Sequence, residues 1–451
     1  MTAAPPRLLT LAWPMFAELL LGIAVGLIGT LLAARLSDAA GGAFALANHL
    51  AAMLFLLFRT IGAGISVVVT QNLGGGRRDR ADAVARATLG ASTWIGGATA
   101  LLALAGAGPL LRLMNTPAEV LPLAQPFLMA LAPALMLDAF NASMSSVMRA
   151  HLRTRDTLAM IVVMQVVHLL LVLPAMRWLG LPGYALALAA SRTLGLALHV
   201  LLWRTRLGLR PQAHDWVRLP RRELGAVLHI GLPAAAENMG WRAAFMVSVA
   251  VVAQLGAQAL ATHAYVMQLI YNMLLFGLAT GLAAEIVIGH QIGAGHLHAA
   301  HKLVRRAMAW GLAMSFSAAL IGALAGPWLL KMFTHDPAIL AAGATLLWLT
   351  VALEPGRTFN LVVINALRAA GDARYPVMAG AASMLVVLAG GSWFFGLHLG
   401  WGLPGVWLAY IADEWIRGLL MWRRWARHDW VPYARATHRR MHRQHSGAFT
   451  A

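Results

Sequence analysis

The sequence predicts an all-α integral membrane protein with twelve transmembrane helices, arranged as two parallel six-helix bundles. Three observations predict this fold class. Hydrophobic residues make up 60% of the 451 residues and charged residues only 12%, about half the charge of a soluble domain. The apolar residues fall into blocks of roughly 20 residues or more, the length that spans a bilayer as a helix. Rare residue types recur at a shift of about 219 residues, which indicates an internal repeat.

Twelve apolar blocks are long enough to span a membrane. The first block is interrupted only by Glu18 and is too long for the core of a signal peptide, so we expect a retained helix. Barrel strands would alternate over about ten residues instead. The predicted helices are Leu8–Ala34, Ala43–Val69, Ala83–Leu104, Leu121–Met148, Thr157–Trp178, Gly183–Trp203, Ala226–Ala253, Ala257–Ile288, Leu303–Leu324, Ile339–Ile364, Val377–Phe395 and Gly402–Met421.

The basic residues follow the loops and give the orientation. The net charge of +18 could suggest nucleic acid, but Lys and Arg lie at intervals between the apolar blocks. Most of them fall on one side of the membrane, and the other side holds only Arg35, Arg112, Arg177 and Lys331. Because basic loops remain cytoplasmic, we expect a multi-pass protein of the inner (plasma) membrane with both termini cytoplasmic and no nucleic-acid partner.

The internal repeat divides the chain into four parts. Each copy holds six helices, so both copies have the same orientation, as in secondary transporters built from parallel repeats. The residues that match at the repeat shift include Pro14 and Pro233, Glu18 and Glu237, Gly62 and Gly281, Arg86 and Arg305, Asn141 and Asn360, and Arg149 and Arg368. The predicted parts are an N-terminal bundle (1–203), a basic cytoplasmic linker (204–225), a C-terminal bundle (226–422) and a basic cytoplasmic tail (423–451).

Several stretches, in this order and duplicated, resemble the multidrug and toxic compound extrusion (MATE) family. They are WPMFAELL, QNLGGGRRDRADAVARATLG, GLPAAAEN, HQIGAGHLHAAHKLVRR, LEPGRTFNLVVINALRAAGDARYPV and GVWLAYIADEWIRGLLMW. The resemblance covers nearly the whole chain and indicates a divergent bacterial branch. It implies two six-helix bundles and export of cationic or amphipathic compounds in exchange for protons or sodium ions.

The chain departs from the family pattern at the family's cation sites. Where the resemblance implies an Asp-Thr pair late in the first helix, this chain has Gly29 and Thr30. In the fifth helix His168 and Val172 replace the usual Asn and Asp, and Trp241 stands at the usual glutamate of the seventh helix. Arg357 replaces an aspartate of the tenth helix, so the family's coupling sites are not carried over.

Glu18 and Glu237 are the first candidates for proton or cation coupling. Each lies four residues after a proline, at repeat-related positions inside a predicted helix. An ionised side chain in mid-membrane costs roughly 2.5–3.5 kcal/mol on insertion scales. A carboxyl group removed from water binds a proton more readily, which suits a proton carrier. The alternative is structural, with each glutamate hydrogen-bonded inside its own bundle.

Asp138 and Glu354 are two further coupling candidates. Glu354 and Arg357 lie three residues apart on one helical face and predict a local ion pair. Asp138 is the counterpart of Arg357 under the shift and could oppose it in a cavity between the halves. Structural pairing is the alternative for both. Asp413, Glu414 and Arg417, one turn apart, predict a stabilising pair in the last helix.

Polar and aromatic residues of several predicted helices could line a substrate cavity. Amides could instead join helices, and His168 could be either a titrating group or a packing residue. A pocket for many substrates combines a few polar groups with aromatic rings. The candidate cavity residues are Asn48, His49, Asn141, Trp241, Tyr265, Gln268, Asn272, Arg357 and Asn360.

The predicted function is a secondary active antiporter that works by alternating access as a monomer. We expect no enzyme activity, no metal and no cofactor other than the coupling ion, H+ or Na+. Cysteine is absent and the histidines show no metal-ligand spacing. One alternative is a flippase for a lipid-linked precursor, which would need a cationic cavity, and for which Arg59, Arg242 and Arg357 are available. Another is a membrane-embedded enzyme, which would need clustered catalytic motifs.

Overall fold

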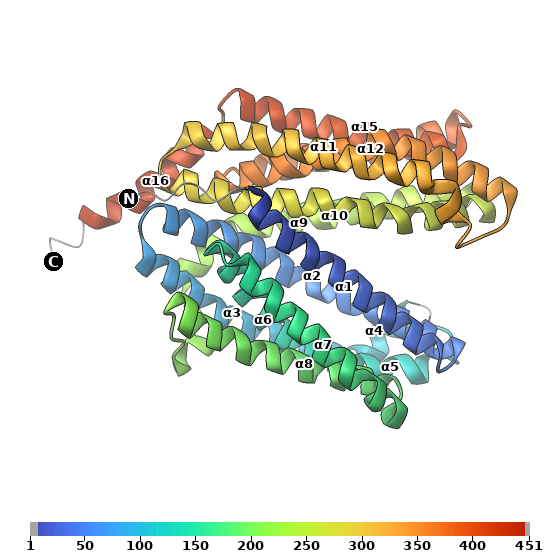
Figure 1. Cartoon of the computed structure of the whole chain (residues 1–451), viewed down its shortest axis with the longest axis horizontal. Coiled ribbons are helices and arrows are strands. Elements are labelled where there is room, and N and C mark those ends of the chain that lie inside the picture. The colour runs from blue at the N-terminus through green and yellow to red at the C-terminus, as the bar shows by residue number, and fades with distance from the viewer. Residues whose placement is uncertain (1–7, 115, 447–451) are drawn as a thin grey trace. The chain divides into compact units, whose positions relative to one another are not determined.

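The computed structural model describes residues 8–114 and 116–446, with the side chains of residues 56–61 and 440–446 outside the description. The described chain is mostly helical and contains no strand (Figure 1). This agrees with the predicted fold class. Residues 447–451 of the predicted tail and the side chain of Arg59 lie outside the described part.

The helices of the first copy match the predicted apolar blocks closely. The predicted fourth helix is divided by a bend of 42° between α5 and α6. The helices are α1 (Leu8–Ala34), α2 (Asp38–Gly74), α3 (Arg78–Ala105), α4 (Ala107–Leu113), α5 (Leu121–Ala130), α6 (Ala132–Ala150), α7 (Thr154–Leu179) and α8 (Leu181–Leu202). Two short helices follow, η1 (Trp203–Leu207) and η2 (Ala213–Trp216).

The second copy repeats this order and ends in an additional helix. Its helices are α9 (Arg221–Gln254), α10 (Ala257–Gly293), α11 (Leu297–Leu330), α12 (Pro337–Ala369), α13 (Arg374–Ser383), η3 (Met384–Gly390), α14 (Gly391–Trp393), η4 (Phe394–His398), α15 (Gly402–Ala426) and α16 (Val431–Ser446). The segments α13, η3, α14 and η4 follow one another without a break and form one span, Arg374–His398.

Two expected boundaries differ from the structure because charged residues continue the helices. The predicted linker ends at residue 225, whereas α9 already begins at Arg221. The predicted tail begins at residue 423, whereas α15 runs to Ala426 and α16 forms from Val431 onward. Apolar blocks mark the part of a helix that lies in lipid, and a helix that continues into water carries charge there.

Eight helices of the described chain are long and apolar enough to cross a membrane, and the bent pair α5 and α6 is a ninth span. The helices α2, α9 and α15 contain 37, 34 and 25 residues, long enough for a span at about 1.5 Å per residue. With them the described chain has the twelve predicted spans.

Helix ends recur at the spacing of the sequence repeat. The helices α2 and α10 each contain 37 residues, and their first residues, Asp38 and Ala257, are separated by the repeat shift. The same shift separates Ala150 and Ala369, the last residues of α6 and α12. From α8 and α15 onward the shift is larger by three. Trp203 and Trp425 stand at this larger shift, and both are buried.

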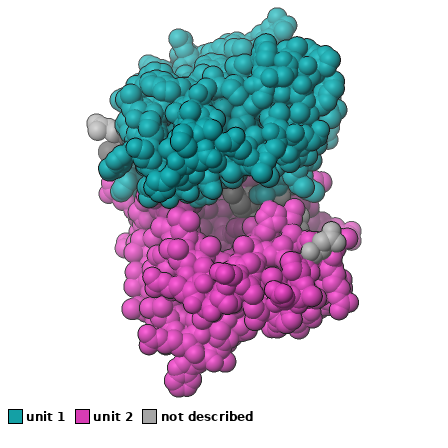
Figure 2. All heavy atoms as spheres, turned by 90° about the vertical axis from the view of Figure 1, so that its right-hand side faces the viewer, with its two compact units in different colours: residues 1–16, 74–76, 233–451 teal, residues 17–73, 77–232 magenta. Residues whose placement is uncertain are grey.

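The structure separates into two compact units, shown in teal and magenta in Figure 2. Unit 1 contains residues 1–16, 74–76 and 233–451, and unit 2 contains residues 17–73 and 77–232. Within unit 1, α12 packs against α10, α11 and α15. Within unit 2, α6 packs against α3 and α8, and α8 packs against α7. The helices α6 and α12, which carry Asp138 and Glu354, are therefore central to their units.

Candidate functional site

Glu18 lies in an ion pair within unit 2. Arg149 of α6 donates from Nη1 to Glu18 Oε2 at 2.9 Å. Thr157, near the start of α7, donates from its hydroxyl to the other carboxylate oxygen at 2.6 Å. The Glu18 side chain is only 8% exposed, so these two donors replace the water that the carboxylate loses.

Glu237 has the equivalent partner within unit 1. Arg368, at the end of α12, donates from Nη2 to Glu237 Oε2 at 2.5 Å. Glu237 and Arg368 are the repeat mates of Glu18 and Arg149. The arrangement agrees with the structural alternative for both glutamates, and it assigns a role to two arginines that the sequence analysis matched but did not pair.

Asp138 pairs with Arg192 inside unit 2. The guanidinium Nε of Arg192, on α8, lies 2.7 Å from Asp138 Oδ1 on α6. One turn further along α6, Asn141 donates its amide to the Arg192 backbone carbonyl at 3.0 Å. The Asn141 Oδ1 atom lies 2.9 Å from Nδ1 of His199, a buried residue of α8. Asn141 therefore joins α6 to α8, which agrees with the helix-joining alternative for this amide.

The largest group of buried charges lies in unit 1, between α12 and α15. Arg357 donates from Nη1 to Glu354 Oε1 at 2.6 Å, the local pair that the sequence predicted. It also donates from Nε to Glu414 Oε1 at 3.3 Å. Asn360 donates its amide to Glu414 Oε2 at 2.8 Å.

The group continues along α15. Arg417 Nη2 lies 2.7 Å from Asp413 Oδ2 and 3.0 Å from Glu414 Oε2, which confirms the predicted pairing in the last helix. Ser383 donates its hydroxyl to Asp413 Oδ1 at 2.7 Å. We call Glu354, Arg357, Asp413, Glu414 and Arg417 the charge network; each of the five side chains is at most 11% exposed.

The charge network contains one more carboxylate than guanidinium. Glu354, Asp413 and Glu414 are acidic, and only Arg357 and Arg417 are basic. Within the described residues, the second oxygen of Glu354 is buried and has no hydrogen-bond partner. An unbalanced buried carboxylate is expensive unless a proton or a cation neutralises it. Glu354 can therefore take up one positive charge without breaking an existing pair.

The two units place opposite charges at equivalent positions. Asp138 and Arg357 match at the repeat shift, and Arg192 and Glu414 match at the larger shift found in the last helix. The pair Asp138–Arg192 of unit 2 therefore has the same place as Arg357–Glu414 of unit 1, with the charges exchanged. The structure gives each of these residues a partner inside its own unit.

Aromatic rings fill the region of unit 2 around Gly29. A Cβ atom at Gly29 would lie 2.8 Å from Phe44 Cζ and 2.8 Å from the Tyr184 hydroxyl. Tyr184 packs edge-on against Phe44 at 4.8 Å between ring centroids, and against His168 at 4.9 Å. A carboxylate at position 29 would have no room here. His168 is a buried packing residue in this cluster.

The other candidate cavity residues are distributed over three helices. Trp241 on α9 stacks on Phe245 with 5.1 Å between ring centroids, and Tyr265 on α10 stacks on Phe333 at 5.3 Å. On α10, Gln268 and Asn272 are exposed. On α2, Asn48 is half-buried and His49 is exposed. The structure thus brings Arg357 and Asn360 of α12 together at the charge network. The other six residues lie on α2, α9 and α10 and are not part of it.

Comparison with known proteins places this geometry in a family. The sequence profile described as MatE matches residues 14–173 and 233–393, one match in each copy. The chain belongs to the MatE family. An uncharacterised transporter of Bacillus subtilis, YisQ, is 31% identical over 430 residues, which cover 94% of each chain. A probable multidrug resistance protein NorM of Bradyrhizobium diazoefficiens is 27% identical over 92% of each chain.

Solved structures show the same fold. The Vibrio cholerae MATE transporter VcmN in its bent form superposes with a TM-score of 0.85 at 19% identity, over 95% of this chain and 97% of that one. As a MatE protein the chain is a multi-pass membrane transporter, and its family points to transport rather than catalysis. Within the described residues, no three His, Asp or Glu side chains are grouped so that they could hold a metal ion.

In this MatE chain the basic and neutral partners of the acids are not evident from the spacing of residues along one helix. Arg149, Arg368 and Arg192 each neutralise a candidate carboxylate, and Thr157 adds a hydroxyl. The repeat shift was the available signal, because it matches Arg149 with Arg368 as well as Glu18 with Glu237. For Arg192 the signal was weaker, since its counterpart Glu414 appears only after the change of shift in the last helix.

Proposed function

We propose that this protein is a secondary active antiporter that exports cationic or amphipathic small molecules in exchange for protons or sodium ions. The names of several relatives, which contain the words multidrug resistance, support the class of substrate. The observation that carries the coupling proposal is the surplus carboxylate of the charge network.

Glu354 is the group we assign to ion coupling. Its Oε1 atom is paired with Arg357, and its Oε2 atom is buried without a hydrogen-bond partner among the described residues. A proton or a sodium ion at this atom neutralises the network, and its release restores a site that attracts a cationic substrate. Each charge moved across the membrane contributes about 2.3 kcal/mol per 100 mV, which is enough to drive export when the ion enters.

Glu18, Glu237 and Asp138 have a weaker claim to this role. Each is balanced by one arginine in its own unit. Protonation of such a carboxylate leaves a buried guanidinium unpaired, which costs free energy rather than releasing it. The coupling of this chain is thus expected to be asymmetric, with the exchangeable charge in unit 1.

The positive charges in this chain offer little support for the flippase alternative. Arg357 is neutralised by Glu354 and Glu414, so it adds no free positive charge to a cavity. Arg242 is half-buried on α9. A cationic cavity for a lipid-linked anion would need several unpaired guanidinium groups, and the antiporter remains our single proposal.

Transport in reconstituted vesicles tests the proposal. Purified protein is expected to move a cationic dye when a pH gradient or a sodium gradient is imposed, and the two gradients applied separately identify the ion. Glu354→Gln is expected to reduce gradient-driven transport to background, while its melting temperature stays within a few degrees of wild type. The matched control is Glu119→Gln, an exposed loop acid that is expected to transport normally.

Three outcomes would contradict parts of the proposal. Wild-type transport by Glu354→Gln would exclude Glu354 as the coupling group. If Glu18→Gln or Glu237→Gln abolished transport without loss of folding, coupling would belong to the repeat-related glutamates. An absence of dye movement under either gradient, with folded protein, would remove the antiporter proposal itself.

A further inference from the structure

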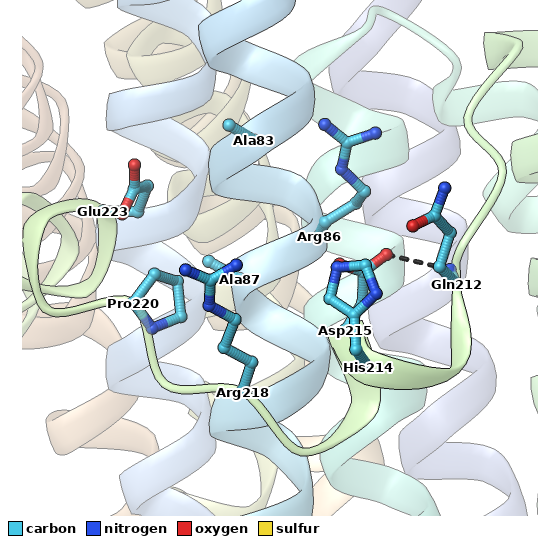
Figure 3. Close-up of a pocket in the computed structure, with 9 residues that line it drawn as sticks. All are labelled: Ala83, Arg86, Ala87, Gln212, His214, Asp215, Arg218, Pro220 and Glu223. Carbon is cyan, nitrogen blue, oxygen red and sulfur yellow. Dashed lines mark hydrogen bonds and ion pairs between the residues drawn. The ribbon is translucent and has the colours of Figure 1, made fainter.

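A polar cavity lies at the linker between the two copies, inside unit 2 (Figure 3). We call it the linker cavity; its volume is about 370 Å³, within the range of small-ligand pockets. Arg86 reaches it from α3, and Gln212, His214, Asp215 and Arg218 reach it from the linker. Glu223, in the first turn of α9, lies at the far end from Arg86 and Gln212.

The wall of this cavity is fixed by contacts between the linker and the helices. Trp94 of α3 donates its indole N–H to the Val217 carbonyl at 2.8 Å. Trp216 packs on Phe140 of α6 with 5.2 Å between ring centroids. The Gly90 Cα faces the Arg218 carbonyl so closely that a side chain there would collide with it. The wall of the cavity is therefore held in place by defined contacts of the fold.

The two arginines of the cavity supply charge that no salt bridge neutralises. Among the side chains that the structure describes, neither Arg86 nor Arg218 forms a direct ion pair, although Asp82, one turn before Arg86 on α3, lies close enough to interact with it electrostatically. Asp215 is already engaged, because its Oδ2 accepts from the Gln212 backbone N–H at 2.8 Å and its Oδ1 lies 3.2 Å from His214 Nε2. The side of the cavity near α3 therefore offers two guanidinium groups to an anion.

Exposed apolar side chains border Arg218. Its two neighbours, Val217 and Leu219, are 57% and 47% exposed, and Trp94 on the adjacent helix is 54% exposed. In a membrane protein such side chains contact lipid, and an exposed tryptophan is typical of the membrane interface. A cavity with two arginines on one side, bordered by apolar side chains on the expected cytoplasmic side, fits a phospholipid, with the phosphate inside and the acyl chains outside.

We propose that the linker cavity binds the phosphate of an anionic glycerophospholipid of the inner leaflet, between Arg86 and Arg218. Guanidinium groups suit this ligand because they donate paired N–H groups to phosphate oxygens. The Gln212 side-chain amide is a further donor at the same wall. A lipid bound here would stabilise the folded linker against α3. The proposal does not depend on the transport function.

Lipid-dependent thermal stability of the purified, full-length protein in detergent tests the site. A ligand that binds only the folded state raises the melting temperature with concentration. Phosphatidylglycerol is expected to raise the melting temperature of wild type. The lipid concentration that gives half of this effect is expected to be at least tenfold higher in the Arg86→Ala/Arg218→Ala variant. The Arg86→Lys/Arg218→Lys variant keeps the charge, and its half-saturating lipid concentration is expected to lie between those of wild type and the double alanine variant. The matched control, Arg305→Ala, removes the repeat mate of Arg86, which does not line the cavity, and is expected to resemble wild type.

Three outcomes decide the proposal. An unchanged half-saturation in the double alanine variant overturns it. Equal stabilisation by phosphatidylcholine and by phosphatidylglycerol also overturns it, because the site would then not recognise anionic lipid. Free glycerol 3-phosphate separates the two sources of phosphate. If this soluble ion stabilised the protein at the same concentration as the lipid, the proposal of a lipid ligand would be overturned. The cavity would then be assigned to a soluble phosphate ester.

Discussion

Glu18 and Glu237 are held in the same way, because each carboxylate pairs with the arginine 131 residues further along the chain. The two pairs are copies of one interaction, Glu18–Arg149 in unit 2 and Glu237–Arg368 in unit 1. A repeated ion pair between two helices of one unit is the pattern expected of a structural element. The charge network of unit 1 has no such copy among the described residues of unit 2, where only the charge-exchanged pair Asp138–Arg192 stands at the equivalent place.

Removal of either arginine is expected to destabilise the protein. Arg149→Ala leaves Glu18 buried and charged, with Thr157 as its remaining donor, and Arg368→Ala leaves Glu237 without its guanidinium partner. We expect losses of about 3 kcal/mol or more in each case, measured by thermal or denaturant unfolding in detergent. Arg153→Ala, which removes a partly exposed pair at 3.7 Å, should cost about 1 kcal/mol or less. Equal effects of all three variants would contradict this account.

The hydroxyl of Thr157 is expected to contribute separately. Thr157→Val keeps the shape but removes the donor to Glu18 Oε1, at a cost of about 1–3 kcal/mol for a buried charged acceptor left short of one partner. Thr193→Val is a suitable control, since that exposed hydroxyl donates only to the Ala189 carbonyl of its own helix. Both variants are compared by denaturant midpoint. A cost at Thr193 as large as at Thr157 would show that the effect is one of helix propensity.

Each residue of the pair Asp138–Arg192 is expected to be tolerated in the folded protein only while the other is present. Asp138→Asn leaves a guanidinium that is 15% exposed without its carboxylate, so we expect a loss of about 1–3 kcal/mol. Removing both charges in Asp138→Leu/Arg192→Leu should recover most of that loss, because the cost of burying charge disappears with the charges. A double-mutant cycle on unfolding free energies measures the coupling. Additive losses would mean that the two residues act independently.

Two glycines of α3 provide a test of the linker position. Gly90→Ala places a Cβ against the Arg218 carbonyl and must displace the linker, so we expect several kcal/mol of destabilisation. Gly97→Ala meets no atom within 4 Å and should gain up to about 1 kcal/mol from helix propensity. Protease cleavage within residues 204–222 should increase for Gly90→Ala alone. A protected linker in that variant would contradict the close approach.

His151, just beyond the end of α6, is expected to make stability depend on pH. Burial lowers the pKa of His151 below its ordinary value, against the opposing effects of the Val147 carbonyl and Asp82, and with the support of nearby Arg78 and Arg153. The unfolded chain then binds a proton more readily than the folded chain, so stability falls as the pH drops below about 6.5. The melting temperature of His151→Asn should fall less than that of wild type between pH 7.5 and 5.5. Parallel curves would refute this effect.

Much of the fold could be predicted from composition and spacing. Blocks of apolar residues located the spans because lipid requires them, and the shift of rare residues located the repeat. The start of α9 at Arg221 and the helix α16 could not be found this way, since helices in water need no apolar block. The local pairs Glu354–Arg357 and Asp413–Arg417 could be predicted because helix geometry fixes neighbours three and four residues apart.

Contacts between helices were beyond sequence reasoning. Glu18 and Arg149 are 131 residues apart, and only the packing of α6 brings them together. The surplus charge of the network depends on the position of Glu414 between Arg357 and Arg417, which is a contact between two helices. The spacing of residues along one helix shows which of them share a face. Which residue of the next helix they contact depends on how each helix is rotated about its axis and how deep it lies in the membrane, and a single sequence does not determine these.

The exchanged charges at Asp138–Arg192 and Arg357–Glu414 restrict how the two copies can recombine. A crossover that moved α12 into the place of α6 would set Arg357 against Arg192, two like charges in a buried position. Moving α15 into the place of α8 would set Glu414 against Asp138 with the same result. Only an exchange that carries both helices together keeps each charge with its partner.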